Sequence, residues 1–130
     1  MPQLLIIENE RRDVEFAKRS AEQSGFSSAI NTPSVEAAHA LLEKARTEGQ
    51  DLPNAILLDI DLGAESGLEF LRIRFQRPWL MNIPVVVWTR LGDHYREVCS
   101  LFHIHGYVEK SAGEYELNDA LQSIVQQPRI

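Results

Sequence analysis

The sequence predicts a doubly wound α/β domain, in which a parallel sheet is covered by helices on both faces. Three short apolar runs carry this prediction: LLII at 4–7, AILL at 55–58 and IPVVVW at 83–88. Runs that are short, apolar and bounded by turn residues are typical of strands buried on both faces of a parallel sheet. Helical periodicity follows each run, and this alternation indicates right-handed crossovers.

The first strand is followed by an expected helix at 11–24 and a weak strand at 28–32. The strand has only two apolar residues, which is typical of a sheet edge. A second helix is expected to open at Ser34 and to end near Gly49, because serine favours a helix N-cap and glycine a helix end. The apolar stripes that predict the two helices are Val14, Ala17 and Ala21, and Val35, Ala38, Leu41, Leu42 and Ala45.

The strand at 55–58 ends in Asp59, and the rest of the chain is interpreted around this carboxylate. Ligands of open α/β sheets bind at the carboxyl ends of the strands, so Asp59 is the first candidate for chemistry. The next helix is expected to be capped by Ser66 with Glu69 as a capping box, and to be ended by Pro78. Its predicted core stripe is Leu68, Leu71 and Phe75.

The last third of the chain predicts two more strand and helix pairs. A helix at 93–102 follows the strand at 83–88, and a short strand at 106–109 is followed by a helix at 113–125. The chain is therefore expected to be one domain, residues 1–130, with no room for an output domain.

Composition excludes several classes of function. The net charge of −6 argues against binding of nucleic acid, which requires clustered Lys and Arg. The apolar runs are too short for a membrane span or a signal peptide, so no membrane partner is expected. Cys99 is the only cysteine, which fits a reducing compartment. A cytoplasmic protein is therefore expected.

Polar side chains follow four of the predicted strands. Glu8 and Asn9 follow the first strand and Asp59 the third. Thr89 ends the fourth and Lys110 follows the fifth. Each residue alone could be a cap, a turn or a solvated side chain. Because the carboxyl ends of parallel strands share one edge, the set together predicts a single site.

This set of groups suits the acceptance of a phosphoryl group. A carboxylate is a recognised nucleophile for phosphoryl transfer. The phosphoryl oxygens need positive charge, which a lysine and a divalent cation can supply. Mg²⁺ binds through one or two carboxylates together with water and the phosphate itself.

The chain resembles the receiver domain of bacterial two-component response regulators. The stretches LLIIENE, AILLDIDLGAESGLEFLR, NIPVVVWTR and HGYVEKS carry the resemblance, in that order and at family-like spacing. It is most similar to stand-alone receivers related to the chemotaxis regulator and to single-domain partners of phytochrome-type kinases. The resemblance implies a flavodoxin-like (βα)5 fold, with a five-stranded parallel sheet in the order 2-1-3-4-5.

The resemblance also implies a role for each polar residue near the central strand. Asp59 would be the phosphoacceptor. Glu8 and Asn9 occupy the positions of the acidic pair that holds Mg²⁺, and the backbone carbonyl of Asp61 would be a further metal ligand.

The remaining family positions imply a conformational switch. Thr89 would follow the phosphoryl group, Lys110 would pair with it, and Tyr107 would swing inward. The fourth helix, fifth strand and last helix would then form the face that recruits a downstream protein. The upstream partner would be a sensor histidine kinase or a phosphotransfer protein, and a homodimer is left open.

The sequence departs from the family pattern at four positions. Asn9 stands where Asp is usual, and either Glu10 or Asp61 is a candidate to restore the lost charge. Arg90 replaces a small residue, where it would either crowd phosphoryl entry or supply an extra cation. Ser111 replaces the common Pro, and His103 replaces the usual Gly.

Two alternatives stay open at this stage. The first is a pseudo-receiver that binds a partner without phosphorylation, which Asn9 and Arg90 favour. The second is an aspartate-based phosphatase of the haloacid dehalogenase type, because Asp59 and Asp61 have the spacing of its motif. Those enzymes carry the motif on the first strand and often have a cap domain, and neither feature is predicted here.

Overall fold

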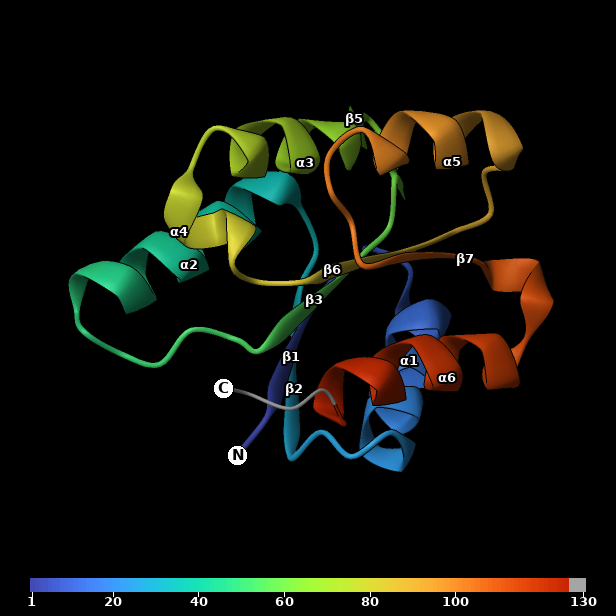
Figure 1. Ribbon diagram of the computed structural model, residues 1–130, viewed down its shortest axis with the longest axis horizontal. Helices are drawn as coiled ribbons and strands as arrows, with labels where there is room; N and C mark the ends of the chain where they lie inside the picture. Colours follow the sequence, from blue (N-terminus) through green and yellow to red (C-terminus); the bar gives the residue numbers. More distant parts are fainter. Residues whose placement is uncertain (127–130) are drawn as a thin grey trace.

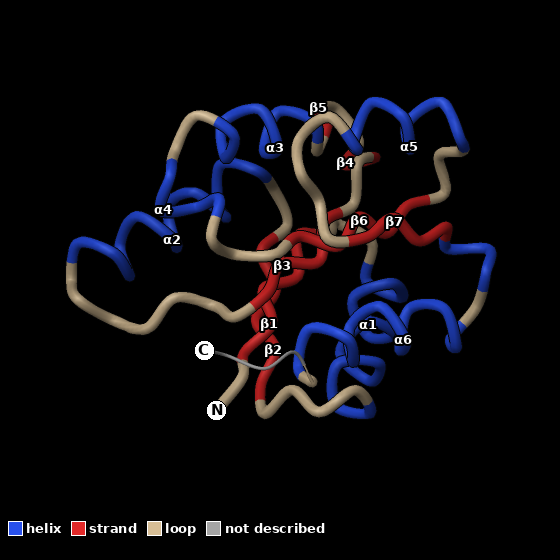
Figure 2. The backbone as a smooth tube through the Cα atoms, in the orientation of Figure 1, coloured by secondary structure: helices blue, strands red, loops and turns tan. Residues whose placement is uncertain are grey.

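A computed structural model describes residues 1–126, so the last four residues of the predicted domain lie outside the described part. Its main sheet is parallel and has five strands in the order β2-β1-β3-β6-β7, which confirms the predicted order (Figure 2). The weak strand β2 lies at the sheet edge, as expected. The strands are β1 (Gln3–Ile7), β2 (Ser28–Thr32), β3 (Ala55–Leu58), β6 (Val85–Thr89) and β7 (Gly106–Glu109).

Helices cover both faces of the sheet, as predicted (Figure 1). One face carries α2, α3, α4 and α5, and the other carries α1 and α6. The bounds are α1 (Arg11–Gln23), α2 (Val35–Thr47), α3 (Leu68–Phe75), α4 (Pro78–Met81), α5 (Asp93–Ser100) and α6 (Glu114–Val125), with a short 3-10 helix, η1 (Lys110–Ala112).

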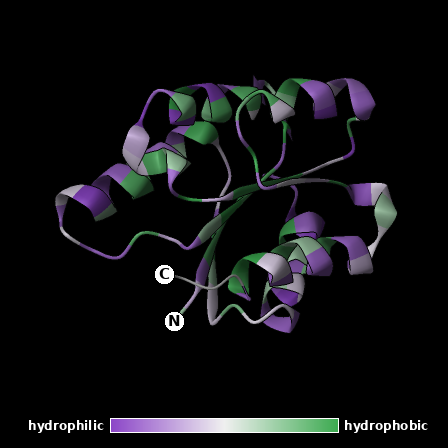
Figure 3. Ribbon diagram, in the orientation of Figure 1, coloured by the Kyte–Doolittle hydropathy of each residue, from purple (hydrophilic) through white to green (hydrophobic). Residues whose placement is uncertain are grey.

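Two apolar cores lie on the two sides of the sheet, and Figure 3 shows hydrophobic strands between half-polar helices. Successive strand residues point to opposite faces. Leu5 and Ile7 therefore join the core under α2, α3 and α5, whereas Leu4 and Ile6 join the core under α1 and α6. This burial on both faces explains why the central strands are apolar without alternation.

A small antiparallel hairpin follows β3 and is not predicted by the sequence. It consists of β4 (Asp61–Leu62) and β5 (Glu65–Ser66), and it turns at Gly63, whose φ is +76°. The hairpin brings the Glu65 carboxylate to the start of α2, where it accepts a hydrogen bond of 2.7 Å from Val35 N.

The predicted details of the third helix are partly wrong. Its N-cap is Gly67, although the Ser66 hydroxyl accepts a hydrogen bond of 3.2 Å from Leu68 N at the start of the helix. Glu69 pairs with Arg72 instead of closing a capping box. Phe75 is 48% exposed, while Phe70 is fully buried and takes the core position. Pro78 does not simply end a helix, because it starts the short helix α4. Leu68 and Leu71 contact the core as predicted. The buried face of α3 consists of Phe70, Leu71 and Arg74, and it excludes Phe75.

The backbone at His103 is left-handed, which explains why glycine is usual at this position in the family that the sequence resembles. Its φ is +57°, a region that glycine adopts without steric cost and other residues rarely adopt. The imidazole ring stacks on Phe75, with 5.7 Å between the ring centroids.

Candidate functional site

Lys110 stands at the centre of a cluster of acidic side chains at the carboxyl edge of the sheet. Its ammonium group donates hydrogen bonds to Glu8 Oε1 at 2.5 Å, to Asp13 Oδ2 at 2.7 Å and to Asp59 Oδ2 at 2.8 Å. Only 4% of the lysine side chain is exposed. Burial alone would lower the pKa of Lys110, but these three acceptors outweigh it and raise the pKa.

Glu8 is a buried carboxylate whose charge is only partly compensated. Its side chain is 1% exposed, and Oε2 accepts hydrogen bonds from the backbone N–H groups of Asn9 and Glu10. Burial and the neighbouring Asp59 raise the pKa of Glu8 and hydrogen bonding to Lys110 lowers it, and the net result is a pKa of about 7. Glu8 therefore takes up and releases a proton near neutral pH.

The raised pKa predicts how the stability of the metal-free protein depends on pH. The native Glu8 carboxyl has a pKa of about 7 against an ordinary value of 4.5, so the native state holds this proton to higher pH. The stabilisation is fully present below pH 4.5 and is lost as pH rises through 7. Relative to Glu8→Gln, the wild-type free energy of unfolding is expected to fall by about 3 kcal/mol over this range.

Urea unfolding at pH values between 4.5 and 7 measures the free energy of unfolding of each variant. The prediction concerns how steeply this free energy changes with pH in wild type compared with Glu8→Gln. Glu36→Gln, which replaces an exposed carboxylate on α2, is the control and is expected to keep the wild-type slope. Equal slopes for wild type and Glu8→Gln would contradict the assignment.

Asp59 lies at the tip of the central strand β3, as expected. It is 4% exposed, and its Oδ1 accepts a hydrogen bond of 2.9 Å from Asp61 N. Its carboxylate borders a cavity of about 240 Å³ that opens at the sheet edge. The cavity is lined by Glu8, Asn9, Glu10, Asp59, Asp61, Gly63 and Arg90.

The oxygen ligands of this cavity fit a hard divalent cation. Glu8 and Asp59 present buried carboxylates, whereas Asn9 and Asp61 are exposed at the cavity wall. Hard cations bind such oxygens and fill their remaining positions with water or phosphate. Within residues 1–126, no group of three His, Cys, Asp or Glu side chains is arranged to hold a metal by itself. Binding would therefore need Asn9, a backbone carbonyl or water as well.

Asp13 is a member of the cluster that the sequence analysis missed. Arg90 donates to both of its carboxylate oxygens, at 2.9 and 3.1 Å, and Lys110 donates to one of them. Burial would raise the pKa of Asp13, but these hydrogen bonds outweigh it and lower the pKa. A signal existed, because Asp13, Ala17 and Ala21 are spaced by four and share the buried face of α1.

Thr89 and Tyr107 are linked through the loop that follows β6. Thr89 is fully buried, and its hydroxyl accepts a hydrogen bond of 3.4 Å from Leu91 N. The Tyr107 hydroxyl donates to the carbonyls of Leu91 and Gly92, at 2.5 and 3.1 Å. The phenol ring is half-buried and carries the Arg96 guanidinium over its face at 4.7 Å.

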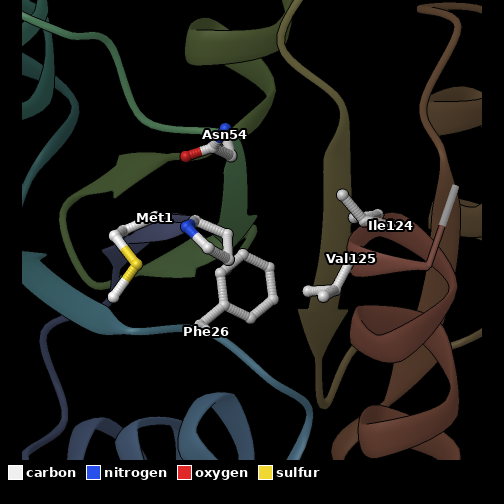
Figure 4. Close-up of a pocket in the computed structure, with 6 residues that line it drawn as sticks. Met1, Phe26, Asn54, Ile124 and Val125 are labelled. Atoms are coloured by element: carbon white, nitrogen blue, oxygen red, sulfur yellow. The ribbon is translucent and has the colours of Figure 1, made fainter. Parts of the chain in front are cut away.

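A second cavity, of about 290 Å³, lies near the amino ends of the strands (Figure 4). Met1, Phe26, Ile124 and Val125 supply apolar side chains to its walls, and Asn54 supplies a polar one. It contains no ionisable side chain, so the cluster around Lys110 is the better candidate for chemistry.

Comparisons with known proteins identify the family of the chain. The family model of the response regulator receiver domain matches residues 4–122. The response regulator Rcp1 of Synechocystis sp. is 28% identical over 124 residues, which cover 93% of this chain and 84% of that protein.

Solved structures of response regulators are also similar to this chain. The crystal structure of the Mn²⁺-bound form of response regulator Rcp1 has a TM-score of 0.76 at 29% identity, covering 95% of this chain and 91% of the other. The bacteriophytochrome response regulator RtBRR has a TM-score of 0.81 at 26% identity, covering 100% and 81%. Among the helices in residues 1–126, none combines the length and apolarity needed to cross a bilayer. The chain belongs to the family of response regulator receiver domains.

Proposed function

We propose that the chain accepts a phosphoryl group on Asp59 from the phosphohistidine of a histidine kinase or phosphotransfer protein. The single observation that carries the proposal is the buried Lys110 ammonium, held 2.8 Å from the Asp59 carboxylate beside an open cavity. A carboxylate oxygen of Asp59 forms a bond to phosphorus while the phosphorus–nitrogen bond of the donor breaks. The imidazole leaves with the electron pair, and Lys110 neutralises charge on the phosphoryl oxygens.

Glu8, Asn9, Asp59 and the backbone carbonyl of Asp61 would hold Mg²⁺ in the cavity. The cation would supply positive charge to the phosphoryl oxygens. The Mn²⁺-bound form of Rcp1, which is 29% identical, supports a divalent cation in this family. The amide of Asn9 contributes no charge, so a weaker site than one with a second carboxylate is proposed.

The proposed response involves Thr89, Tyr107 and the loop between them. Thr89 would turn toward the phosphoryl group and pull the loop that holds the Tyr107 hydroxyl at Leu91. This movement would shift the population of conformations at the face formed by α5, β7 and α6. The proposed output is the binding of a downstream protein at this face.

Treatment with acetyl phosphate and Mg²⁺ tests the proposal. Intact-mass measurement is expected to show one phosphate adduct on the wild type and none on Asp59→Asn, because the amide is not a nucleophile for phosphorus. Asp51→Asn replaces an exposed carboxylate before β3 and is expected to keep the adduct. An adduct that persists in Asp59→Asn would place the acceptor elsewhere.

The second candidate is a pseudo-receiver that binds its partner without phosphorylation. Asn9 and the ion pair between Arg90 and Asp13 are the observations that favour it. Absence of any adduct with Mg²⁺, Mn²⁺ or Ca²⁺ would support this candidate over the first.

A further inference from the structure

Arg90 follows directly after β6 and lines the same cavity as Asp59. Its side chain is 63% exposed, and its guanidinium makes a two-pronged contact with Asp13. One prong and the Lys110 ammonium share the same oxygen, Asp13 Oδ2, at 2.9 and 2.7 Å. The guanidinium is therefore only one carboxylate away from the lysine that contacts Asp59.

The contact between Arg90 and Asp13 can be exchanged because its arginine side is open to water. The Arg90 side chain is 63% exposed, whereas the Asp13 side chain is 12% exposed, so the partner that must stay paired is Asp13. If Arg90 leaves, Asp13 keeps its hydrogen bond from Lys110, so no buried carboxylate is left without a partner. A dianionic phosphoryl group is a stronger acceptor for a guanidinium than a single carboxylate, because it offers more charge and three oxygens in matching geometry.

The charges of the cavity wall make this exchange useful. Asn9 places a neutral amide at a position where a carboxylate would draw in a cation, and Arg90 adds a fixed positive charge on the same wall. Arg90 would therefore supply part of the positive charge that a bound phosphoryl group would otherwise need from the metal.

We propose that Arg90 releases Asp13 on phosphorylation and binds the phosphoryl oxygens on Asp59, so that acceptance of the group depends less on a divalent cation. This inference rests on the proposed function, and it assigns Arg90 and Lys110 together as the cationic clamp. Asp13 binds both cations before the phosphoryl group arrives, and it keeps its hydrogen bond from Lys110 after Arg90 has moved.

Initial rates of phosphorylation by acetyl phosphate test the inference, in Mg²⁺ and in EDTA. In this reaction Asp59 oxygen forms the bond to phosphorus and acetate leaves with the electron pair. Arg90→Ala is expected to lower the rate in EDTA by roughly 10- to 100-fold, the range for a lost hydrogen bond to a charged group. The loss in Mg²⁺ is expected to be smaller, because the cation covers part of the same charge.

Three matched variants sharpen the result. Arg72→Ala, which removes an exposed arginine on α3 that does not line the cavity, is the control and is expected to keep the wild-type rates. Arg90→Lys keeps the charge but not the fork, so an intermediate rate is expected. Adding Asn9→Asp to Arg90→Ala is expected to restore the rate in Mg²⁺ and not in EDTA.

Binding of beryllofluoride, a phosphoryl mimic, gives a readout that does not depend on turnover. The fluorescence of Trp88 reports binding, because its ring lies 4.8 Å from the Lys110 ammonium. Trp79→Phe removes the other tryptophan, so that the signal comes from Trp88. In EDTA, Arg90→Ala is expected to weaken binding roughly 10-fold or more relative to the Arg72→Ala control.

The outcomes separate this inference from the function on which it rests. One outcome is that wild type and Arg90→Ala have equal rates and equal beryllofluoride affinities while an adduct still forms on Asp59. This outcome would contradict the role of Arg90 and would leave the proposed function standing. Absence of an adduct in every variant, including those with Asn9→Asp, would overturn the proposed function as well.

Discussion

Replacement of Arg74 by alanine is expected to lower the free energy of unfolding by about 3–5 kcal/mol. Arg74 lies on α3, is 2% exposed, and is the largest fully buried side chain in the described residues. Its guanidinium donates to the carbonyls of Ile83 at 3.1 and 3.3 Å and of Phe102 at 3.0 Å. Truncation would leave a cavity and would orphan buried carbonyl groups, and both effects destabilise.

The Arg74 guanidinium connects the end of α3 by hydrogen bonds to the segments before β6 and after α5. Burial lowers the pKa of Arg74, and no carboxylate in residues 1–126 forms an ion pair with it. Its contribution therefore comes from hydrogen bonds to backbone carbonyls rather than from a salt bridge.

Urea unfolding of three variants separates the effects at this position. Arg74→Met keeps most of the apolar stem and loses the donors, so a loss smaller than that of Arg74→Ala is expected. Arg72→Ala, two residues away and exposed, is the control and is expected to change little. A loss for Arg74→Ala no larger than that of the control would show that the buried guanidinium is dispensable.

Replacement of Gly67 by alanine is expected to slow phosphorylation of Asp59 by roughly 100-fold, since a displacement of about 1 Å can cost that much. An added Cβ would lie 2.3 Å from the backbone oxygen of Asp59 and 2.9 Å from Ile60 Cα. The φ of Gly67 is −62°, which alanine adopts readily, so the effect comes from the close approach alone. The tip of β3 would have to move, and the acceptor would move with it.

The same variant is expected to lose about 1–3 kcal/mol of stability, the usual cost of overpacking. Gly106→Ala is the matched control, because an added Cβ there meets nothing within 4 Å. Initial rates with acetyl phosphate and urea unfolding measure both effects. A wild-type rate in Gly67→Ala would mean that the tip of β3 tolerates the shift without harm to the site.

The order of the strands in the chain and the place of Asp59 were predictable from the sequence. Uninterrupted apolar runs mark strands buried on both faces, and a polar residue at the end of each run marks the carboxyl edge of the sheet. Because parallel strands share that edge, Glu8, Asp59 and Lys110 were expected together, and the structure brings them together around the Lys110 ammonium. This prediction was possible because local periodicity is enough to locate the end of each strand.

The partners of these residues were decided by tertiary structure. Asp13 was hidden in a helical pattern, because the role of a polar residue on a buried face depends on what the sheet places opposite it. The pairing of Arg90 with Asp13 joins residues 77 positions apart, and no local pattern encodes such a distance. The close approach of Gly67 to Asp59 and the burial of Arg74 likewise exist only once the chain is packed.

The sequence by itself thus determined the fold class, the central acceptor candidate and the charge of the site edge. Tertiary packing decided which carboxylates share Lys110, where Arg90 is held, and how far the Glu8 pKa rises. The physical reason is that periodicity reports burial within one element. Hydrogen bonding, desolvation and steric contact between elements depend on distances that only the folded chain sets.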